Sequence, residues 1–260
     1  MRTLFIYTAG LLLSSFAYGQ NGTISLGTFK FDKKSTSKAT VYQDNKNGFV
    51  FYKADYDLDE DGNPRAYHPE NKGLLHNDNG SSNDKMSKSV VVYVGEKPYI
   101  QTEKDPAPGY YLSMTSLRIK GYADIDYRRY VNPDEVSYFV LPGNKFKKQG
   151  VNVGDIGLVY NTLNKKYAFA IFADAGPGDI IGEGSILLAN KLGIKNYIDN
   201  KGRIRGGVDS GDILYIVFPN SGKGTYTSLT EDDVEQLGAT ITKKYGNAES
   251  IIQEMLSYYK

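Results

Sequence analysis

The feature that most constrains the fold of this chain is a succession of short apolar runs separated by turn-forming residues. From residue 48 onward, runs of Tyr, Val, Ile and Phe recur between clusters of Gly, Pro, Asn and Asp. Short length with β-branched and aromatic enrichment is typical of strands rather than helices. The predicted strands cover residues 48–52, 89–94, 110–119, 136–141, 155–160, 166–173 and 212–218. We therefore predict a mainly β domain.

Three stretches depart from this pattern and predict helices. Residues 185–192 have helical spacing and end at Gly193, the residue best suited to the left-handed position after a helix. Thr230 opens a capping-box-like start to a helix that continues to about residue 245, and another helix is predicted over residues 248–259. Residues 77–84 have the composition of a flexible loop. The fold class is thus α+β, a single mainly β domain with a few helices.

The N-terminus has the three-part layout of a secretory signal peptide. Arg2 supplies a basic start, and the apolar run over residues 4–13 is too short to span a bilayer. Small residues at Ala17 and Gly19 then precede a predicted cleavage site before Gln20. A buried N-terminal helix is the alternative. Without cysteine a lipoprotein anchor is excluded, so we expect a secreted protein, extracellular or periplasmic.

Charge and residue types exclude several classes of function. Lys and Arg number 31 against 30 Asp and Glu, so the chain lacks the basic excess of a nucleic-acid binder. There is no cysteine, and the two histidines, His68 and His76, leave little for zinc or triad chemistry. Hydrolytic chemistry would therefore fall to carboxylates. We expect no cofactor, no resident metal and no membrane span.

A dense acidic segment begins at Asp55 and holds five carboxylates within seven residues. Asp57, Asp59 and Asp61, with the glycine that follows, match the opening of a calcium loop. Such a loop needs a bidentate Glu at its twelfth position, which here is His68. The alternatives are a solvated acidic turn, or carboxylates that bind the ammonium groups of a cationic sugar polymer.

Two further carboxylates lie at the end of a predicted strand and at the start of a predicted helix, where side chains are held rigidly. Asp174 follows the strongly apolar run 167–173, and Glu183 directly precedes a predicted helix, with a Gly-rich connection between them. Both would lie on the same rim. Glycosidic hydrolysis needs such a pair, one carboxyl to protonate the leaving oxygen and one to activate water or attack the sugar. The alternatives are a turn residue for Asp174 and a helix-dipole charge for Glu183.

Taken together, these residues resemble glycoside hydrolase family 75, the chitosanases of fungi and bacteria. The likeness covers residues 48–220, and its most specific block is Asp-x-Gly-Pro…Ile-Gly-Glu-x-Ser at residues 174–185. The supporting blocks are residues 55–62, 64–69, 109–117, 140–142, 154–155 and 213–219. The chain lacks the cysteines of the fungal members, as a cysteine-free bacterial relative would, and Tyr56 and Glu60 alter the acidic block.

The resemblance implies endo-hydrolysis of a β-1,4-linked glucosamine polymer with inversion, and it implies that Asp174 and Glu183 are the two essential acids. We expect Glu183 to be the general acid, its pKa raised by burial, and Asp174 to be the base. More loosely, the strand and Gly-led helix around this block are similar to hydrolases built on a six-stranded double-psi β-barrel. The predicted substrate-binding residues are Asp57, Asp59, Asp61 and Tyr67.

Other functions stay open at this point. They are a hydrolase of another amino-sugar polymer, such as peptidoglycan or partly acetylated chitin, a non-catalytic carbohydrate-binding protein, and a calcium-stabilised adhesion module. The predicted organisation is a signal peptide over residues 1–19, a leading strand and surface segment over 20–47, a catalytic domain over 48–220, and a helical extension of that domain over 221–260. We expect a monomer whose partner is a polysaccharide.

Overall fold

The computed structural model describes residues 22–32, 35–82, 85–176 and 178–259, and the predicted signal peptide lies outside them. With 35% strand against 18% helix, the chain is a mainly β single domain, as predicted. In the described part, no helix is both long enough and apolar enough to cross a membrane.

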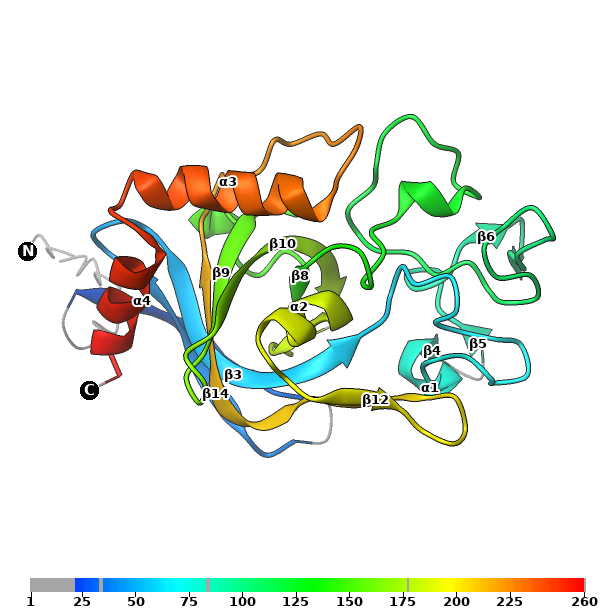
Figure 1. Ribbon diagram of the computed structural model, residues 1–260, viewed down its shortest axis with the longest axis horizontal. Helices are drawn as coiled ribbons and strands as arrows, with labels where there is room; N and C mark the ends of the chain where they lie inside the picture. Colours follow the sequence, from blue (N-terminus) through cyan, green and yellow to red (C-terminus); the bar gives the residue numbers. More distant parts are fainter. Residues whose placement is uncertain (1–21, 33–34, 83–84, 177, 260) are drawn as a thin grey trace, which may run out of the picture.

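Six strands close into a barrel (Figure 1), which confirms the six-stranded barrel expected from the sequence. Closure is completed by pairing between the first and last strands of the ring, so the barrel has no free edge there. In order around the ring the strands are β3 (Val50–Asp59), β11 (Glu183–Ser185), β8 (Tyr138–Pro142), β10 (Tyr167–Gly176), β9 (Ile156–Asn161) and β14 (Val208–Val217).

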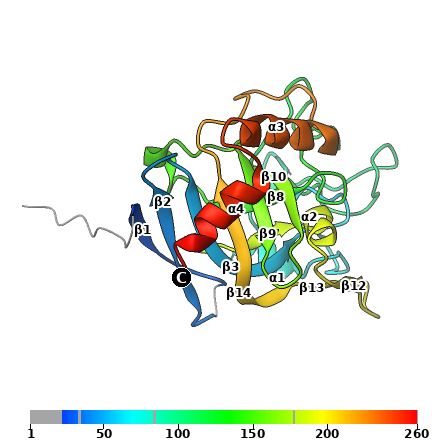
Figure 2. The same cartoon turned by 60° about the vertical axis from the view of Figure 1, so that its left-hand side comes forward.

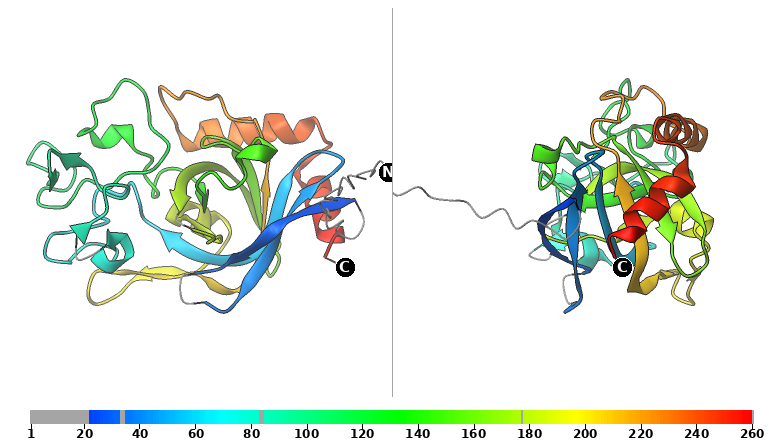
Figure 3. Two further views of the ribbon diagram at one scale, coloured as in Figure 1. Left: turned by 180° about the vertical axis from the view of Figure 1, so that it is seen from behind. Right: turned by 90° about the vertical axis from the view of Figure 1, so that its left-hand side faces the viewer.

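Two N-terminal strands, β1 (Thr23–Lys30) and β2 (Lys38–Asp44), extend the sheet from β3, as Figure 3 shows from behind. The segment 20–47 therefore contributes two strands rather than the one predicted. The end of β1 is tied to the chain before β11, because Lys30 donates to the carbonyl of Asp179 and accepts from the amide of Ile181. This contact helps to hold the segment that leads into Glu183.

The long strand β3 is buried on both faces. Tyr52, Ala54 and Tyr56 belong to one apolar cluster, whereas Phe51 belongs to a second cluster that includes residues of the C-terminal helices. Alternating side chains along a strand point to opposite faces, so one strand serves both clusters. The tyrosine-rich composition is thus largely a property of the core, where Tyr52 and Tyr215 stack with ring centroids 4.8 Å apart.

The three predicted helices are present as α2 (Ile186–Lys191), α3 (Glu231–Lys243) and α4 (Ala248–Ser257). Ser185 caps α2, and a capping box between Thr230 and Asp233 begins α3. The helices α3 and α4 cover the barrel from outside (Figures 1 and 2). Gly238 permits the close approach of α3 to β10, since a Cβ there would lie 2.1 Å from the ring of Phe169.

The region between β3 and β8 is mostly irregular and differs from the sequence prediction. The run 110–119 forms isolated bridges rather than the predicted strand, because each bridge joins it to a different segment and no continuous strand pairs with it. The predicted loop 77–84 contains an ordered short helix capped by His76. The short elements here are α1 (Asn77–Gly80), β4 (Ser81–Ser82), β5 (Lys85–Met86), β6 (Tyr93–Val94) and β7 (Lys97–Pro98).

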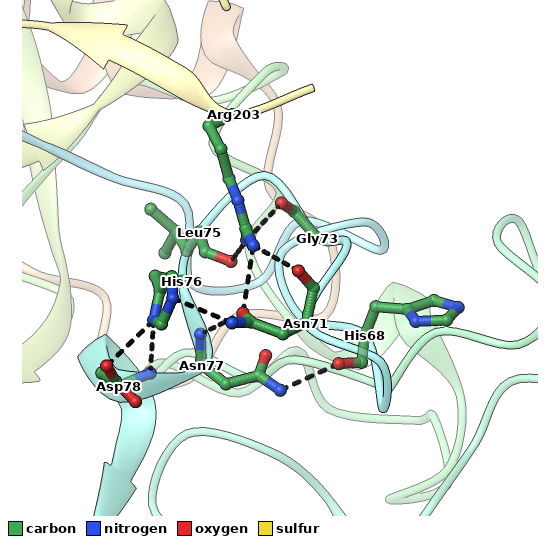
Figure 4. A network of polar contacts seen from close by, with 8 residues as sticks. All are labelled: His68, Asn71, Gly73, Leu75, His76, Asn77, Asp78 and Arg203. Atoms are coloured by element: carbon green, nitrogen blue, oxygen red, sulfur yellow. Dashed lines mark hydrogen bonds and ion pairs between the residues drawn. The ribbon is translucent and has the colours of Figure 1, made fainter. Parts of the chain in front are cut away.

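A further hairpin, β12 (Asn196–Ile198) and β13 (Ile204–Gly206), projects below the barrel towards this irregular region (Figure 1). Arg203, just before β13, is buried and anchors the hairpin. Its guanidinium donates to the carbonyls of Asn71, Gly73 and Leu75, and the Gly73 contact is 2.8 Å long (Figure 4). The hairpin and the loop after β3 are therefore held together.

Candidate active site

The barrel brings the acidic segment and Glu183 side by side. Strands β3 and β11 are parallel neighbours, with Glu183 opposite Asp57 and Ser185 opposite Asp59. The amide of Asp57 donates to the carbonyl of Gly182 at 2.8 Å. Residues far apart in the sequence thus share one end of the barrel.

The acidic segment is neither a solvated turn nor a calcium loop. Asp55, Asp57 and Asp59 lie in extended strand β3, and the chain turns only afterwards, at Gly62. Gly62 has φ +91°, and a Cβ there would lie 2.1 Å from the carbonyl oxygen of Val131. Within the described residues, no group of three or more acidic or histidine side chains is arranged to hold a metal ion.

Asp174 lies within β10 rather than after it, since the strand continues to Gly176. The pairing with β8 shifts register between Phe172 and Asp174, and such a bulge re-aims the side chains beside it. The carboxyl is 8% exposed, and its Oδ1 accepts from both the amide and the hydroxyl of Ser116, at 2.7 and 2.8 Å. Burial raises the pKa of Asp174, while these donors and the nearby Arg118 counteract the shift.

Glu183 reaches the same place from β11. Its Oε2 lies 3.4 Å from the position that a Cβ on Gly176 would occupy, two residues beyond Asp174 on β10. Glycine at position 176 therefore leaves room for this carboxyl. The preceding Gly182 has φ +106°, and a Cβ there would lie 2.0 Å from Oδ1 of Asp55. The pair of carboxylates predicted to share a rim does converge at the end of β10.

The surroundings of Glu183 differ from those of Asp174. No donor among the described residues hydrogen-bonds its carboxyl, and its neighbours are other acids. Burial, followed by the charges of Asp59, Asp57 and Asp174, raises the pKa of Glu183 to about 8. Glu183 therefore keeps its proton at neutral pH.

The predicted substrate-binding aspartates lie beside this pair. Burial and then Asp174 raise the pKa of Asp59 to about 7. Burial, followed by Asp32 and Asp209, raises the pKa of Asp57 to about 6. Both side chains are half-buried and remain reachable from solvent.

Asp61 and Tyr67 lie deeper. Asp61 is 9% exposed, and its carboxyl accepts from the hydroxyl of Ser113 at 3.3 Å and is hydrogen-bonded to Tyr67. Burial, then Asp59 and Asp174, raise the pKa of Asp61 well above its ordinary value. Tyr67 is 2% exposed, so its ring has no free face for stacking on a sugar and instead orients Asp61.

Sequence reasoning did not identify Ser116 and Arg118 as part of the site. Ser116 also accepts from the amide of Ala175 at 3.0 Å, which links its loop to β10 on both sides of Asp174. Arg118 stacks over the ring of Tyr130 at 4.8 Å and is the cation that acts on Asp174. Both residues lie in the run 110–119, which was predicted as a strand. No feature of the neighbouring sequence indicated that this run contacts Asp174.

The two histidines have structural roles outside this site (Figure 4). The ring of His76 accepts from the amide of Asp78 and lies 3.1 Å from its carboxylate. His68 accepts from the amide of Glu70, and its ring packs edge-on against Tyr110. The chemistry of the site therefore rests on Asp174 and Glu183. One carboxyl held by donors and one protonated carboxyl are suited to general acid–base chemistry.

Comparison with known families gave one matching family. A family model described as the fungal chitosanase of glycosyl hydrolase group 75 matches residues 56–248. The matched stretch contains the paired carboxylates, the Ser116 loop and helix α3. A search of curated proteins gave no match.

Proposed function

This chain belongs to glycoside hydrolase family 75, and from that premise we propose that it is a secreted endo-chitosanase that cleaves β-1,4 linkages with inversion. Membership of the family supports a glycoside hydrolase that acts on chitosan. The observation that carries the proposed mechanism is the contrast between Asp174, hydrogen-bonded by Ser116, and Glu183, which accepts from no described residue and keeps a proton to about pH 8.

In the proposed reaction Glu183 is the general acid. It gives its proton to the glycosidic oxygen as the bond from that oxygen to the anomeric carbon breaks. Asp174 is the general base, and takes a proton from the water whose oxygen bonds to the opposite face of that carbon. Glu183 ends ionised and Asp174 protonated, and exchange with solvent restores both. The two amide and hydroxyl donors from Ser116 favour the ionised form that Asp174 needs at the start.

The acidic surroundings favour a cationic polymer. Asp57 and Asp59 are half-buried carboxyls with raised pKa values, and each would be stabilised in its ionised form by an ammonium group of the substrate. An N-acetylated sugar has no charge to offer them. This favours chitosan over chitin or peptidoglycan as the substrate. In this proposal Tyr67 positions Asp61 and does not itself touch the sugar.

The test is the release of reducing ends from highly deacetylated chitosan by purified residues 20–260, with product sizing. We expect oligomers from the wild type, and a loss of about 10³-fold in rate for Glu183→Gln and for Asp174→Asn, since general acid–base groups typically contribute 10² to 10⁴. Glu96→Gln is the matched control, because that side chain is 90% exposed and pairs with the exposed Lys88 on the surface. NMR of the first products should show the α-anomer.

Three outcomes would contradict parts of the proposal. Full activity of Glu183→Gln would remove its role as the acid. First products in the β-anomer would show retention instead of inversion. Binding of chitosan without cleavage by the wild type would indicate a non-catalytic carbohydrate-binding protein.

Secretion is tested separately. Protein recovered outside the cytoplasm should have an N-terminus that begins at Gln20, and mass spectrometry of the intact protein measures this.

A further inference from the structure

Tyr138 lies on the strand between the two carboxyls of the proposed reaction. It belongs to β8, which is flanked in the sheet by β11, the strand of Glu183, and by β10, the strand of Asp174. Its Cα is paired with that of Ile171 on β10, and its side chain is 0% exposed. The ring therefore does not touch a substrate, and any effect of Tyr138 on the reaction must pass through its hydrogen bonds.

The hydroxyl of Tyr138 holds the turn that follows β3. It donates to the carbonyl of Asp61 at 2.9 Å and to that of Asp59 at 3.2 Å, so the backbone on both sides of Glu60 is attached to one hydroxyl. Burial raises the pKa of the Asp59 carboxyl to about 7, and the same hydroxyl acts against that shift. Tyr138 thus fixes the position of Asp59 and favours its ionised form.

The main chain of Tyr138 is attached to the strand of Glu183. Its amide donates to Oγ of Ser185 at 3.0 Å, two residues after Glu183. The carbonyl of Ser185 accepts from the hydroxyl of Tyr56 at 2.6 Å, so Ser185 is held from a second side. A Cβ on Gly184 would lie 2.6 Å from that hydroxyl and 3.0 Å from the carbonyl oxygen of Tyr138, so these groups pack closely. Tyr138 therefore connects the strand of Glu183 to the turn after β3.

The position of Asp59 matters because of its charge. The charged groups that face Glu183 are all acids, namely Asp55, Asp57, Asp59 and Asp174. Burial, and then Asp59 before any other charge, raises the pKa of Glu183. Because the interaction between two charges weakens with distance, a turn that moved away would reduce the effect of Asp59 on Glu183.

We propose that Tyr138 is a positioning residue, whose hydroxyl holds the turn after β3, and with it the Asp59 carboxyl, against Glu183. The proposal rests on the proposed function, because it gives this contact a purpose for the general acid. Tyr138 itself neither touches the substrate nor exchanges a proton. A hydroxyl that only stabilised the barrel would leave the ionisation of Glu183 unchanged, and this difference is measurable.

The experiment measures the ionisation of Glu183 directly. Protein expressed from the full chain, isotope-labelled at the glutamate carboxyls, is titrated by NMR, and the Glu183 signal is identified by its absence from Glu183→Gln. Tyr138→Phe should move the titration midpoint of Glu183 to lower pH by roughly half a pH unit, because it releases the turn and disfavours ionised Asp59. Asp59→Asn removes the charge and should move the midpoint in the same direction. In that background Tyr138→Phe should have little further effect, since both changes act through one carboxyl.

Two other tyrosines of the barrel provide matched controls. Tyr215 is 1% exposed, and its hydroxyl donates at 3.0 Å to the carbonyl of Asp55, in the middle of β3. Tyr215→Phe should lower the Tm about as much as Tyr138→Phe, because each variant loses a buried hydroxyl that donates to the backbone of the same segment, but it should leave the Glu183 midpoint in place. The hydroxyl of Tyr52 is buried and bonds to no described residue, so Tyr52→Phe should leave the midpoint in place and should not lower the Tm.

Cleavage of chitosan gives a second readout. The alkaline limb of the pH–rate profile reports the acid that must be protonated, so it should move to lower pH in Tyr138→Phe and stay in place in Tyr215→Phe. Titration of the polymer is common to all variants and cancels in this comparison.

The outcomes separate this inference from the proposed function. An unchanged Glu183 midpoint in folded Tyr138→Phe would overturn the positioning role and leave the proposed function standing. An unchanged midpoint in Asp59→Asn would overturn it equally, and that variant keeps an acceptor for the amide of Asp61. A wild type that cuts no chitosan, but whose Glu183 midpoint depends on Tyr138, would contradict the proposed function and retain the positioning role.

Discussion

Two desolvated carboxyls of this barrel have opposite surroundings. Asp155, just before β9, is 2% exposed and accepts from three backbone amides, those of Gly222 and Asn152 at 2.8 Å and of Asn220 at 3.2 Å. Glu183, in β11, has no donor among the described residues and is surrounded by other carboxyls. Both lose hydration on folding, but only the first is compensated by the protein.

The difference separates a structural acid from a reactive one. Asp155 joins the loop at residues 150–152 to the loop at residues 220–222, and its charge is distributed over fixed amides. Glu183 instead keeps its proton, because burial and the neighbouring carboxylates disfavour its ionised form. A buried acid that accepts hydrogen bonds from the protein stabilises the fold. A buried acid without such donors has a shifted pKa and is available for proton transfer. The following substitutions test that distinction, beginning with the largest expected effect beyond those on catalysis given above.

Asp155→Asn should lower the free energy of unfolding by about 2 to 3 kcal/mol, because its new amide group would face backbone N–H groups and leave them unpaired. At about pH 5, where Glu183 is protonated in the folded protein, Glu183→Gln should change the same quantity by less than about 1 kcal/mol, since its carboxyl accepts no hydrogen bond from any described residue. Chemical denaturation midpoints measure both. Activity per folded molecule should survive in Asp155→Asn. Equal stability losses in the two variants would contradict the claim that Asp155 stabilises the fold and Glu183 does not.

Ser116→Ala would make the surroundings of Asp174 more like those of Glu183. Loss of the hydroxyl donor at 2.8 Å should raise the pKa of Asp174 and lower the rate of chitosan cleavage about tenfold at neutral pH. The acidic limb of the pH–rate profile should move to higher pH, which a purely structural role would not cause. Ser116→Thr keeps the hydroxyl and should restore both the rate and the profile. An unmoved acidic limb in Ser116→Ala would exclude this positioning role.

The smallest effect concerns the pH dependence of stability. Glu183 has a pKa of about 8 in the folded protein against an ordinary 4.5, so between these pH values the folded state binds more protons than the unfolded state. Stability from this group is therefore present at low pH and lost as the pH rises towards 8. The Tm should fall over this interval, and Glu183→Gln should make that fall smaller. A variant with the same pH slope as the wild type would contradict the raised pKa.

Local sequence determined several parts of this molecule. Thr230 and Ser185 predicted helix starts because capping is a short-range interaction between a side chain and the next turn. The apolar runs predicted most barrel strands, with boundaries in error by a few residues, as for β10, which continues through Asp174. The motif that carries Asp174 and Glu183 was also readable, since both residues lie in one short block.

Only the tertiary structure decided how the site is assembled. For the segment beginning at Asp55 the sequence left a calcium loop, a solvated turn and a substrate-binding surface open. Closure of the barrel pairs this segment with Glu183 and buries Asp55, Glu60 and Asp61. Ser116 reaches Asp174 from a run that forms no regular strand, so periodicity could not place it. Capping and strand propensity depend on neighbours in the chain. The pKa values and the donors of a carboxyl depend on which distant segments surround it, and folding alone brings those together.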